Sequence, residues 1–152
     1  MSWLIRFIAT LGPIGYVPWC PGTLASLVTV CLMFMLPPLP WMFHVLLIGA
    51  VLPFSIWSTG MVECECGHKD PSCAVLDEFV GMNVALVGLC HSWQAYVAAF
   101  IAFRFFDILK PFPINVIERR LEGGVGIIMD DVAAGIAARL ALSAISFLWP
   151  LW

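Results

Sequence analysis

The chain has 152 residues, of which 62% are hydrophobic and only 11% are charged, whereas soluble domains carry about 25% charged residues. A domain of this size buries a small share of its surface, so it could not hide so many apolar side chains from water. The formal net charge is −3 and the sequence has no basic tract, which argues against a nucleic-acid-binding protein. Composition therefore predicts a single domain, residues 1–152, embedded in a lipid bilayer.

The chain opens with residues 1–11, which have one apolar helical face and no signal-peptidase cleavage site, so we expect them to lie in the membrane interface. Residues 12–22 are rich in glycine and proline and are not expected to form regular helix. Apolar stretches then predict an all-α integral membrane bundle of about five short hydrophobic helices. The stretches are residues 24–36, 41–61, 79–93, 94–106 and 132–152.

These stretches differ in length. Only residues 41–61 and 132–152 reach the roughly 20 residues that a perpendicular span requires. The shorter stretches would be thin spans, or they would dip into the bilayer and return where the bundle covers their backbone. Residues 37–40 should break the chain between the first two stretches, because three of these four residues are proline. Polar loops are expected at 63–72 and 110–126.

The distribution of charged residues along the chain favours five membrane crossings over four. Five crossings place the N-terminal segment, residues 63–78 and residues 104–131 on one side of the membrane. The other side then receives only residues 37–40 and 91–93, which hold no Lys, Arg, Asp or Glu. Four crossings would separate residues 12–22 from the acidic segments, so five are preferred. The positive-inside tendency makes the charged side cytoplasmic.

Acidic residues stand at the predicted ends of three helices. Asp77 and Glu78 open the third stretch, Asp107 closes the fourth, and Asp130 and Asp131 open the fifth. Carboxylates that converge repel one another unless a cation lies between them. Oxygen-rich clusters of this kind suit Mg²⁺, which takes carboxylates together with waters and substrate phosphate. We therefore predict that both acidic pairs bind Mg²⁺, with Asp107 as a further catalytic member of the cluster.

Basic residues accompany the acids. Arg104, Asp107 and Lys110 recur at i, i+3 and i+6, so they lie on one side of a helix that Pro111 ends. Arginine grips phosphate oxygens in a fork, whereas lysine supplies a point charge. The glycine-rich residues 123–126 would lie in the loop before the last acidic pair, where backbone could approach a ligand closely.

Structural explanations compete with these functional ones. Either acidic pair alone could simply stabilise the N-terminus of its helix. A charged run after Pro113 is expected to be a solvated helix face: Glu118, Arg119, Arg120 and Glu122. Arg139 lies eight residues after Asp131. Its side chain could point back toward the acids or away from them, and the sequence favours neither.

The sequence lacks several phosphate-chemistry motifs. None of its cysteines is followed six residues later by arginine, as a cysteine phosphatase requires, and no glycine–lysine phosphate loop occurs. Metal-assisted hydrolysis remains, with either water as nucleophile or an aspartate as transient phosphoryl acceptor.

Four motifs cover most of the chain. They are G-Y-x-P-x-x-P-G-T at 15–23, H-K-D-P-S at 68–72 running on to D-E-F-V-G-M at 77–82, F-R-x-x-D-x-x-K-P-x-P-I at 103–114, and G-G-x-G-I-x-M-D-D-x-x-A-G at 123–135. In kind and order they resemble the bacterial phosphatidylglycerophosphatase A family.

The resemblance implies Mg²⁺-dependent removal of the terminal phosphate from phosphatidylglycerol phosphate, giving phosphatidylglycerol. It implies a multi-pass protein of the bacterial cytoplasmic (inner) membrane whose lipid substrate is bound at the cytoplasmic face. Arg104, Lys110, Lys69 and His68 are then expected to bind the substrate phosphate. Three alternatives stay open: a phosphatase of another lipid phosphate such as a polyprenyl pyrophosphate, a small cation transporter, and a non-catalytic membrane scaffold.

Overall fold

The described part of the structure is entirely helical. The computed structural model describes residues 3–67 and 71–148, and these ranges form seven α-helices and one 3-10 helix without any strand. The elements are α1 (Trp3–Ala9), η1 (Ile14–Tyr16), α2 (Pro21–Met35), α3 (Trp41–Cys66), α4 (Leu76–Leu86), α5 (Trp93–Leu109), α6 (Ile114–Arg120) and α7 (Gly123–Leu148). The predicted all-α class is confirmed.

Proline, glycine and one lysine set several helix boundaries. Pro21 is the first residue of α2, where its missing N–H costs no hydrogen bond. Gly67 ends α3 in the left-handed conformation and donates its N–H to the carbonyl oxygen of Glu63. Lys110 ends α5 in the same conformation, with φ of 41°, and Pro111 follows. The chain therefore turns sharply at the residue whose side chain is predicted to bind phosphate.

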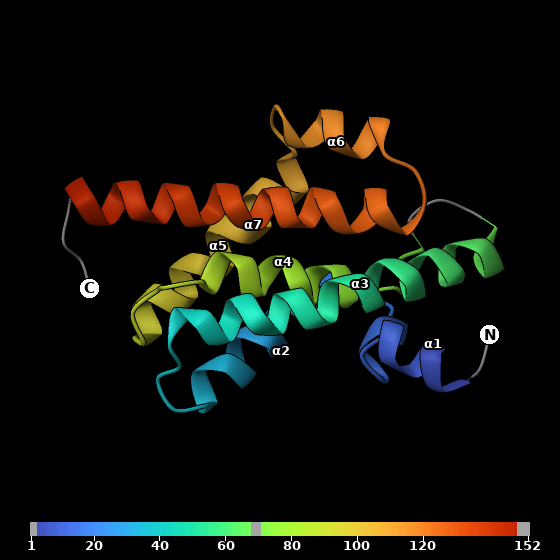
Figure 1. Ribbon diagram of the computed structural model, residues 1–152, viewed down its shortest axis with the longest axis horizontal. Coiled ribbons are helices and arrows are strands. Elements are labelled where there is room, and N and C mark those ends of the chain that lie inside the picture. Colours follow the sequence, from blue (N-terminus) through green and yellow to red (C-terminus); the bar gives the residue numbers. More distant parts are fainter. Residues whose placement is uncertain (1–2, 68–70, 149–152) are drawn as a thin grey trace.

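Helix α7 organises the bundle. It packs against α3, α4, α5 and α6, and Figure 1 shows that it runs antiparallel to α3 along the long axis of the molecule. The shorter α4 packs against both of these long helices. Fully buried apolar side chains from α4, α5 and the start of α6, including Met82, Phe103 and Ile114, form the centre of the core.

Two close helix crossings depend on glycine. A Cβ atom at Gly135 of α7 would overlap the carbonyl oxygen of Gly81 in α4, and one at Gly124 would overlap the carbonyl oxygen of Ile56 in α3. Since backbone atoms cannot move aside as a flexible side chain can, these crossings need residues without a side chain. The first crossing fixes the distance between α4 and α7, which carry the acidic pairs.

The structure differs from the sequence-based expectation in three elements. Residues 123–126 form the first turn of α7 rather than a loop, so Asp130 lies in the third turn of that helix and not at its start. The reason is the close packing of Gly124 on α3, which compensates for the low helix propensity of glycine. Helix α4 ends at Leu86, earlier than predicted, and α3 continues to Cys66, into the predicted polar loop 63–72. Helix α6 contains three residues of the helix face predicted within 110–126, namely Glu118, Arg119 and Arg120.

Two of the helices, α3 and α7, are long and apolar enough to cross a membrane. Figure 1 places the uncharged connections, residues 36–40 and 87–92, at the same end of the molecule, opposite α1 and α6. Large apolar side chains on the helices are exposed, among them Leu46 (71% exposed) and Leu140 (65% exposed). The five-crossing arrangement stays a prediction.

Candidate active site

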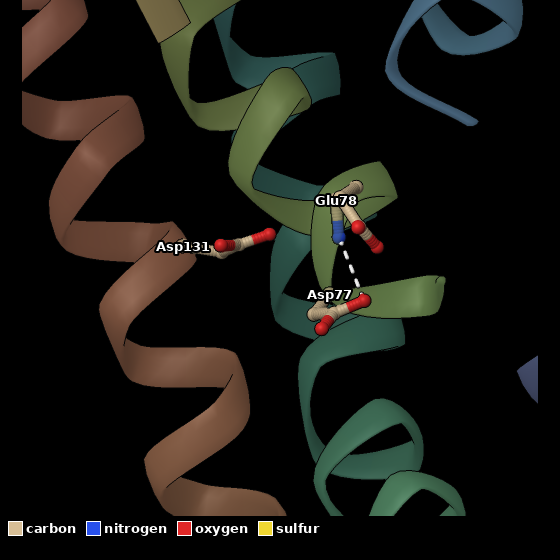
Figure 2. A group of neighbouring side chains, drawn as sticks. All are labelled: Asp77, Glu78 and Asp131. Atoms are coloured by element: carbon tan, nitrogen blue, oxygen red, sulfur yellow. Dashed lines mark hydrogen bonds between the residues drawn. The ribbon is translucent and has the colours of Figure 1, made fainter. Parts of the chain in front are cut away.

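Three carboxylates from two helices meet beside the α4–α7 crossing. Asp77 and Glu78 lie in the first turn of α4, and Asp131 faces them from α7 (Figure 2). One oxygen from each side chain lies within 4.8 Å of one from each of the others. Asp77 and Asp131 are buried, each with 5% of its surface exposed. The structure therefore brings the predicted acidic residues of α4 and α7 together.

Two more carboxylates surround this trio. Asp131 interacts electrostatically with Asp107 in α5, with Glu78 and with Asp130. Asp107 also acts on Glu78. The five predicted acids thus form one cluster built from α4, α5 and α7, here called the carboxylate cluster. Their catalytic and metal-binding roles stay predictions.

Backbone groups lie against the carboxylates of Asp77 and Glu78. The N–H of Glu78 donates to Oδ1 of Asp77 at 3.0 Å. Gly22, the second residue of α2, lies directly against the Glu78 side chain, because a Cβ added at this glycine would overlap Oε1 of Glu78. Sequence reasoning did not assign Gly22 to the site, although the residue lies in a family motif.

Two oxygens of the trio have no hydrogen-bond partner in the described part of the structure. They are Oε2 of Glu78 and Oδ2 of Asp131, and both are buried. Burial raises the pKa of the Glu78 carboxyl, although its hydrogen bond with Asp77 opposes the rise. Buried acceptors without partners are costly, and carboxylate oxygens are the ligands that Mg²⁺ prefers. The trio therefore fits a bound divalent cation.

Asp130 points to a different partner from Asp131. Its Oδ2 accepts a hydrogen bond from Nζ of Lys110 at 2.6 Å, and its Oδ1 accepts from the N–H of Asp131 at 3.1 Å. Asp130 is therefore outside the trio, although the sequence predicts both aspartates as metal ligands. In the structure it positions Lys110.

The two described basic residues of the site are each held by a carboxylate. Nη1 of Arg104 donates to Oδ2 of Asp107 at 2.6 Å, while its Nε is buried and has no hydrogen-bond partner among the described residues. Nζ of Lys110 also donates to Oε1 of Glu118 at 2.7 Å. Burial alone would lower the pKa of Lys110, but the hydrogen bonds to Asp130 and Glu118 outweigh burial and raise this pKa. Lys110 is therefore charged at neutral pH.

Several predictions about individual residues have other outcomes. Glu118 lies on helix α6 with its side chain 40% exposed, in line with the predicted solvated helix face, and it also accepts a hydrogen bond from Lys110. Arg139 points away from the acids and donates to the carbonyl oxygens of Val87 and Gly88, at the C-terminal end of α4. His68 and Lys69, predicted to bind phosphate, lie outside the described residues.

The chain was compared with known proteins. The family model described as phosphatidylglycerophosphatase A matches residues 7–146. A phosphatidylglycerophosphatase A of Escherichia coli is 33% identical over 138 residues, which cover 90% of this chain and 80% of the relative. The Haemophilus influenzae protein of the same name is 48% identical over 88 residues, covering 57% and 53% of the two chains.

The match to a relative with a different name covers a similarly large share of both chains. A protein of Bacteroides thetaiotaomicron, named as a candidate phosphatidylinositol-3-phosphatase, is 38% identical over 143 residues, which cover 89% of each chain. No solved structure matches the chain. Both names describe enzymes that remove a phosphate group from a lipid. The chain belongs to the phosphatidylglycerophosphatase A family, and it is a phosphatase that hydrolyses a phosphate monoester.

Proposed function

We propose that this protein is a Mg²⁺-dependent lipid phosphatase of the bacterial cytoplasmic membrane that converts phosphatidylglycerol phosphate into phosphatidylglycerol. The observation that carries the proposal is the carboxylate trio, in which two buried oxygens have no hydrogen-bond partner within residues 3–67 and 71–148, together with the two cationic side chains of the site. Acids alone would repel a phosphate group, so a cation at the trio is needed for substrate to bind. The matched relatives supply the substrate class.

Asp77, Glu78 and Asp131 would hold the metal ion. A bound Mg²⁺ supplies charge that stabilises the phosphoryl oxygens and favours ionisation of a bound water. Mg²⁺ usually keeps several waters and takes few protein carboxylates, so three ligands are enough. Asp130 would not bind the metal ion and would instead hold Lys110 in position.

The cationic residues bind and orient the substrate phosphate. The buried Nε of Arg104 is a donor without a partner in the described structure, and a phosphate oxygen is a suitable acceptor for it. Asp107 fixes the orientation of this guanidinium through its 2.6 Å hydrogen bond. Lys110 places a second positive charge at the cluster, against Asp130. Both charges offset the negative charge that the phosphoryl group carries in the transition state.

The reaction is a hydrolysis. The oxygen of water forms a bond to phosphorus while the ester bond between phosphorus and the glycerol oxygen breaks. One carboxylate of the cluster takes the proton that water loses, and the departing glycerol oxygen is protonated. The products are a lipid alcohol and inorganic phosphate. Because the site lies toward the charged end of the bundle, the acyl chains can stay in the bilayer throughout.

The test is phosphate release by the purified protein in lipid nanodiscs. Phosphatidylglycerol phosphate should be hydrolysed in Mg²⁺ and not in excess chelator, and Asp77→Asn should be inactive. Glu122→Gln, which neutralises an exposed acid between α6 and α7, serves as control. Full activity in chelator would rule out the metal-dependent mechanism, and ion flux without phosphate release would favour a transporter.

A second substrate is favoured by one comparison. The Bacteroides relative is named for an inositol-lipid phosphatase and covers as much of this chain as the phosphatidylglycerophosphatases do. Phosphatidylinositol 3-phosphate also carries a phosphate monoester on a lipid headgroup. Measuring kcat/KM for both lipids under identical conditions decides between them.

A further inference from the structure

A groove runs along the outer face of α5, next to the first turn of α2. Its lining is almost entirely apolar, and Thr23 of α2 and Arg104 of α5 add only a small polar part to it. The apolar residues are Phe100, Ile101, Phe105, Ile108 and Leu109. Its volume is about 490 Å³, within the range of about 300–1,000 Å³ that is typical of sites for small ligands. We refer to it as the α2–α5 groove.

The apolar wall of the α2–α5 groove is exposed. Ile101, Phe105 and Ile108 recur on one side of α5, and they are 61%, 56% and 67% exposed. A continuous apolar stripe of this kind on a helix surface marks a site that an apolar ligand or a membrane covers. The groove spans residues 100–109, which is about 14 Å along the helix axis at 1.5 Å per residue.

Arg104 connects the groove to the carboxylate cluster. Its side chain lines the groove and also donates to Asp107, a member of the cluster. Thr23 lies next to Gly22, which packs against the Glu78 carboxylate. Both polar residues of the groove are therefore adjacent to the carboxylate cluster. A ligand with an apolar chain and an anionic head would place its head beside Arg104.

A neighbouring groove between α5 and α7 offers a comparison. It shares Ile101 and Phe105 with the α2–α5 groove, but its other lining residues, such as Ala98, Leu142 and Ile145, are all uncharged. It can accept a lipid tail, but no cation in its lining can hold a phosphate. The α2–α5 groove combines the two properties.

We propose that the α2–α5 groove binds one acyl chain of the lipid phosphate substrate and so positions the headgroup phosphate at Arg104. This inference rests on the proposed function and adds to it a specificity site for the chain. Because lipid tails are as apolar as the groove wall, the chain gains packing contacts in the groove and is not removed from water. These contacts should let the enzyme discriminate between long-chain and short-chain forms of the same headgroup. Arg104 beside the groove favours a ligand with an anionic head, whereas bulk lipid or a second copy of the chain would need no positive charge there.

A pair of matched substitutions tests the proposal. Ile108→Trp fills the groove, and Leu46→Trp changes a similarly exposed aliphatic residue on α3, outside the groove (67% and 71% exposed). Each variant is assayed with dipalmitoyl and with dihexanoyl phosphatidylglycerol phosphate. Ile108→Trp should raise KM for the dipalmitoyl substrate about tenfold at unchanged kcat, because the chain loses packing contacts with the groove wall. The dihexanoyl substrate and Leu46→Trp should behave as in the wild type.

Other outcomes overturn the proposal in distinguishable ways. Wild-type kinetics of Ile108→Trp on both substrates would show that no chain occupies the groove. An equal loss on both substrates would show that the groove does not discriminate by chain length. If the wild-type protein releases no phosphate from either lipid, the proposed function fails, and a binding measurement then decides the question of the groove.

That measurement is photocrosslinking. A phosphatidylglycerol phosphate with a diazirine in its acyl chain should label the α5 peptide that contains Ile108 more than the α3 peptide that contains Leu46. An excess of unlabelled substrate should suppress this labelling, and phosphatidylglycerol without the terminal phosphate should suppress it less. Equal labelling of both helices, or labelling that no competitor reduces, would identify the occupant as bulk lipid. Crosslinks between copies of the chain would identify a dimer interface.

Discussion

Lys110 and Asp130, twenty residues apart in the chain, join the end of α5 to the third turn of α7 through a hydrogen bond of 2.6 Å. The left-handed conformation of Lys110 ends α5 and lets the side chain reach α7, while Glu118 contacts the same ammonium group. A positive charge is thereby fixed next to the carboxylate cluster. This charge has a structural role, as partner of two acids, and a proposed catalytic role.

Lys110→Met is the first prediction, and it separates these roles. Phosphate release should fall by about 10²–10³-fold, because the variant loses a fixed charge that stabilises the transition state. Lys110→Met should also lower the melting temperature, because Asp130 loses its cationic partner. The double variant Lys110→Met/Asp130→Asn removes the charge of Asp130, so its melting temperature should recover toward that of the wild type while activity stays low. Arg119→Met, at an exposed position of α6, should change neither property. Wild-type kcat/KM in Lys110→Met would contradict the proposed role.

Gly22→Ala is a second prediction, and it tests the position of Glu78. The new methyl group would overlap Oε1 of Glu78, which can move because it ends a flexible side chain. We therefore expect a small change in stability together with a large loss of activity, as the carboxylate leaves the trio. Gly49→Ala is the matched control, since nothing lies within 4 Å of a Cβ there, and it should stabilise α3 by about 0.5–1 kcal/mol. Thermal melting and phosphate release measured on both variants check this pair.

The helices α2, α3 and α5 could be predicted from the sequence because continuous apolar runs, bounded by prolines or a serine cap, mark them. The beginning of α7 could not be predicted from the sequence. A run of three glycines in four residues is typical of a loop, and only the close approach of α3 to Gly124 makes helix favourable there. Tertiary packing decides such positions, and local propensity does not contain that information. For α6 the charged run after Pro113 indicates a helix face, but the sequence does not show that the helix begins at Ile114.

The convergence of the acids was predictable because acidic residues stood near the ends of three apolar stretches. Their division of labour was not. Successive residues of a helix point about 100° apart, and the sequence does not show which of Asp130 and Asp131 faces α4. The structure turns Asp131 toward Glu78 and Asp130 toward Lys110. Gly22 was missed for a related reason, because its importance depends on a contact with a residue 56 positions later.

Asp131→Asn is a third prediction, directed at the metal site. Without Mg²⁺ the variant should be more stable than the wild type, because one of several mutually repelling buried carboxylates is neutralised. Mg²⁺ at about 100 times its Kd should stabilise the wild type by about 2.7 kcal/mol, and Asp131→Asn should lose most of this gain together with its activity. Melting curves with Mg²⁺ and with chelator measure both effects. A gain in stability from Mg²⁺ that is the same in both proteins would place the ion elsewhere.

Gly124→Ala is the last prediction, and it concerns the scaffold that aligns the site. The added methyl group would overlap the carbonyl oxygen of Ile56, a backbone atom, so α3 and α7 must separate. Overpacking of this kind costs about 1–3 kcal/mol, and we expect a lower melting temperature with only a secondary loss of activity, because Gly124 lies about two turns from Asp131. Gly22→Ala should show the reverse pattern, with activity lost and stability largely kept. Melting and phosphate release measured side by side on the two variants therefore distinguish a contact that holds helices together from one that positions a carboxylate. The same pattern in both variants would refute this distinction.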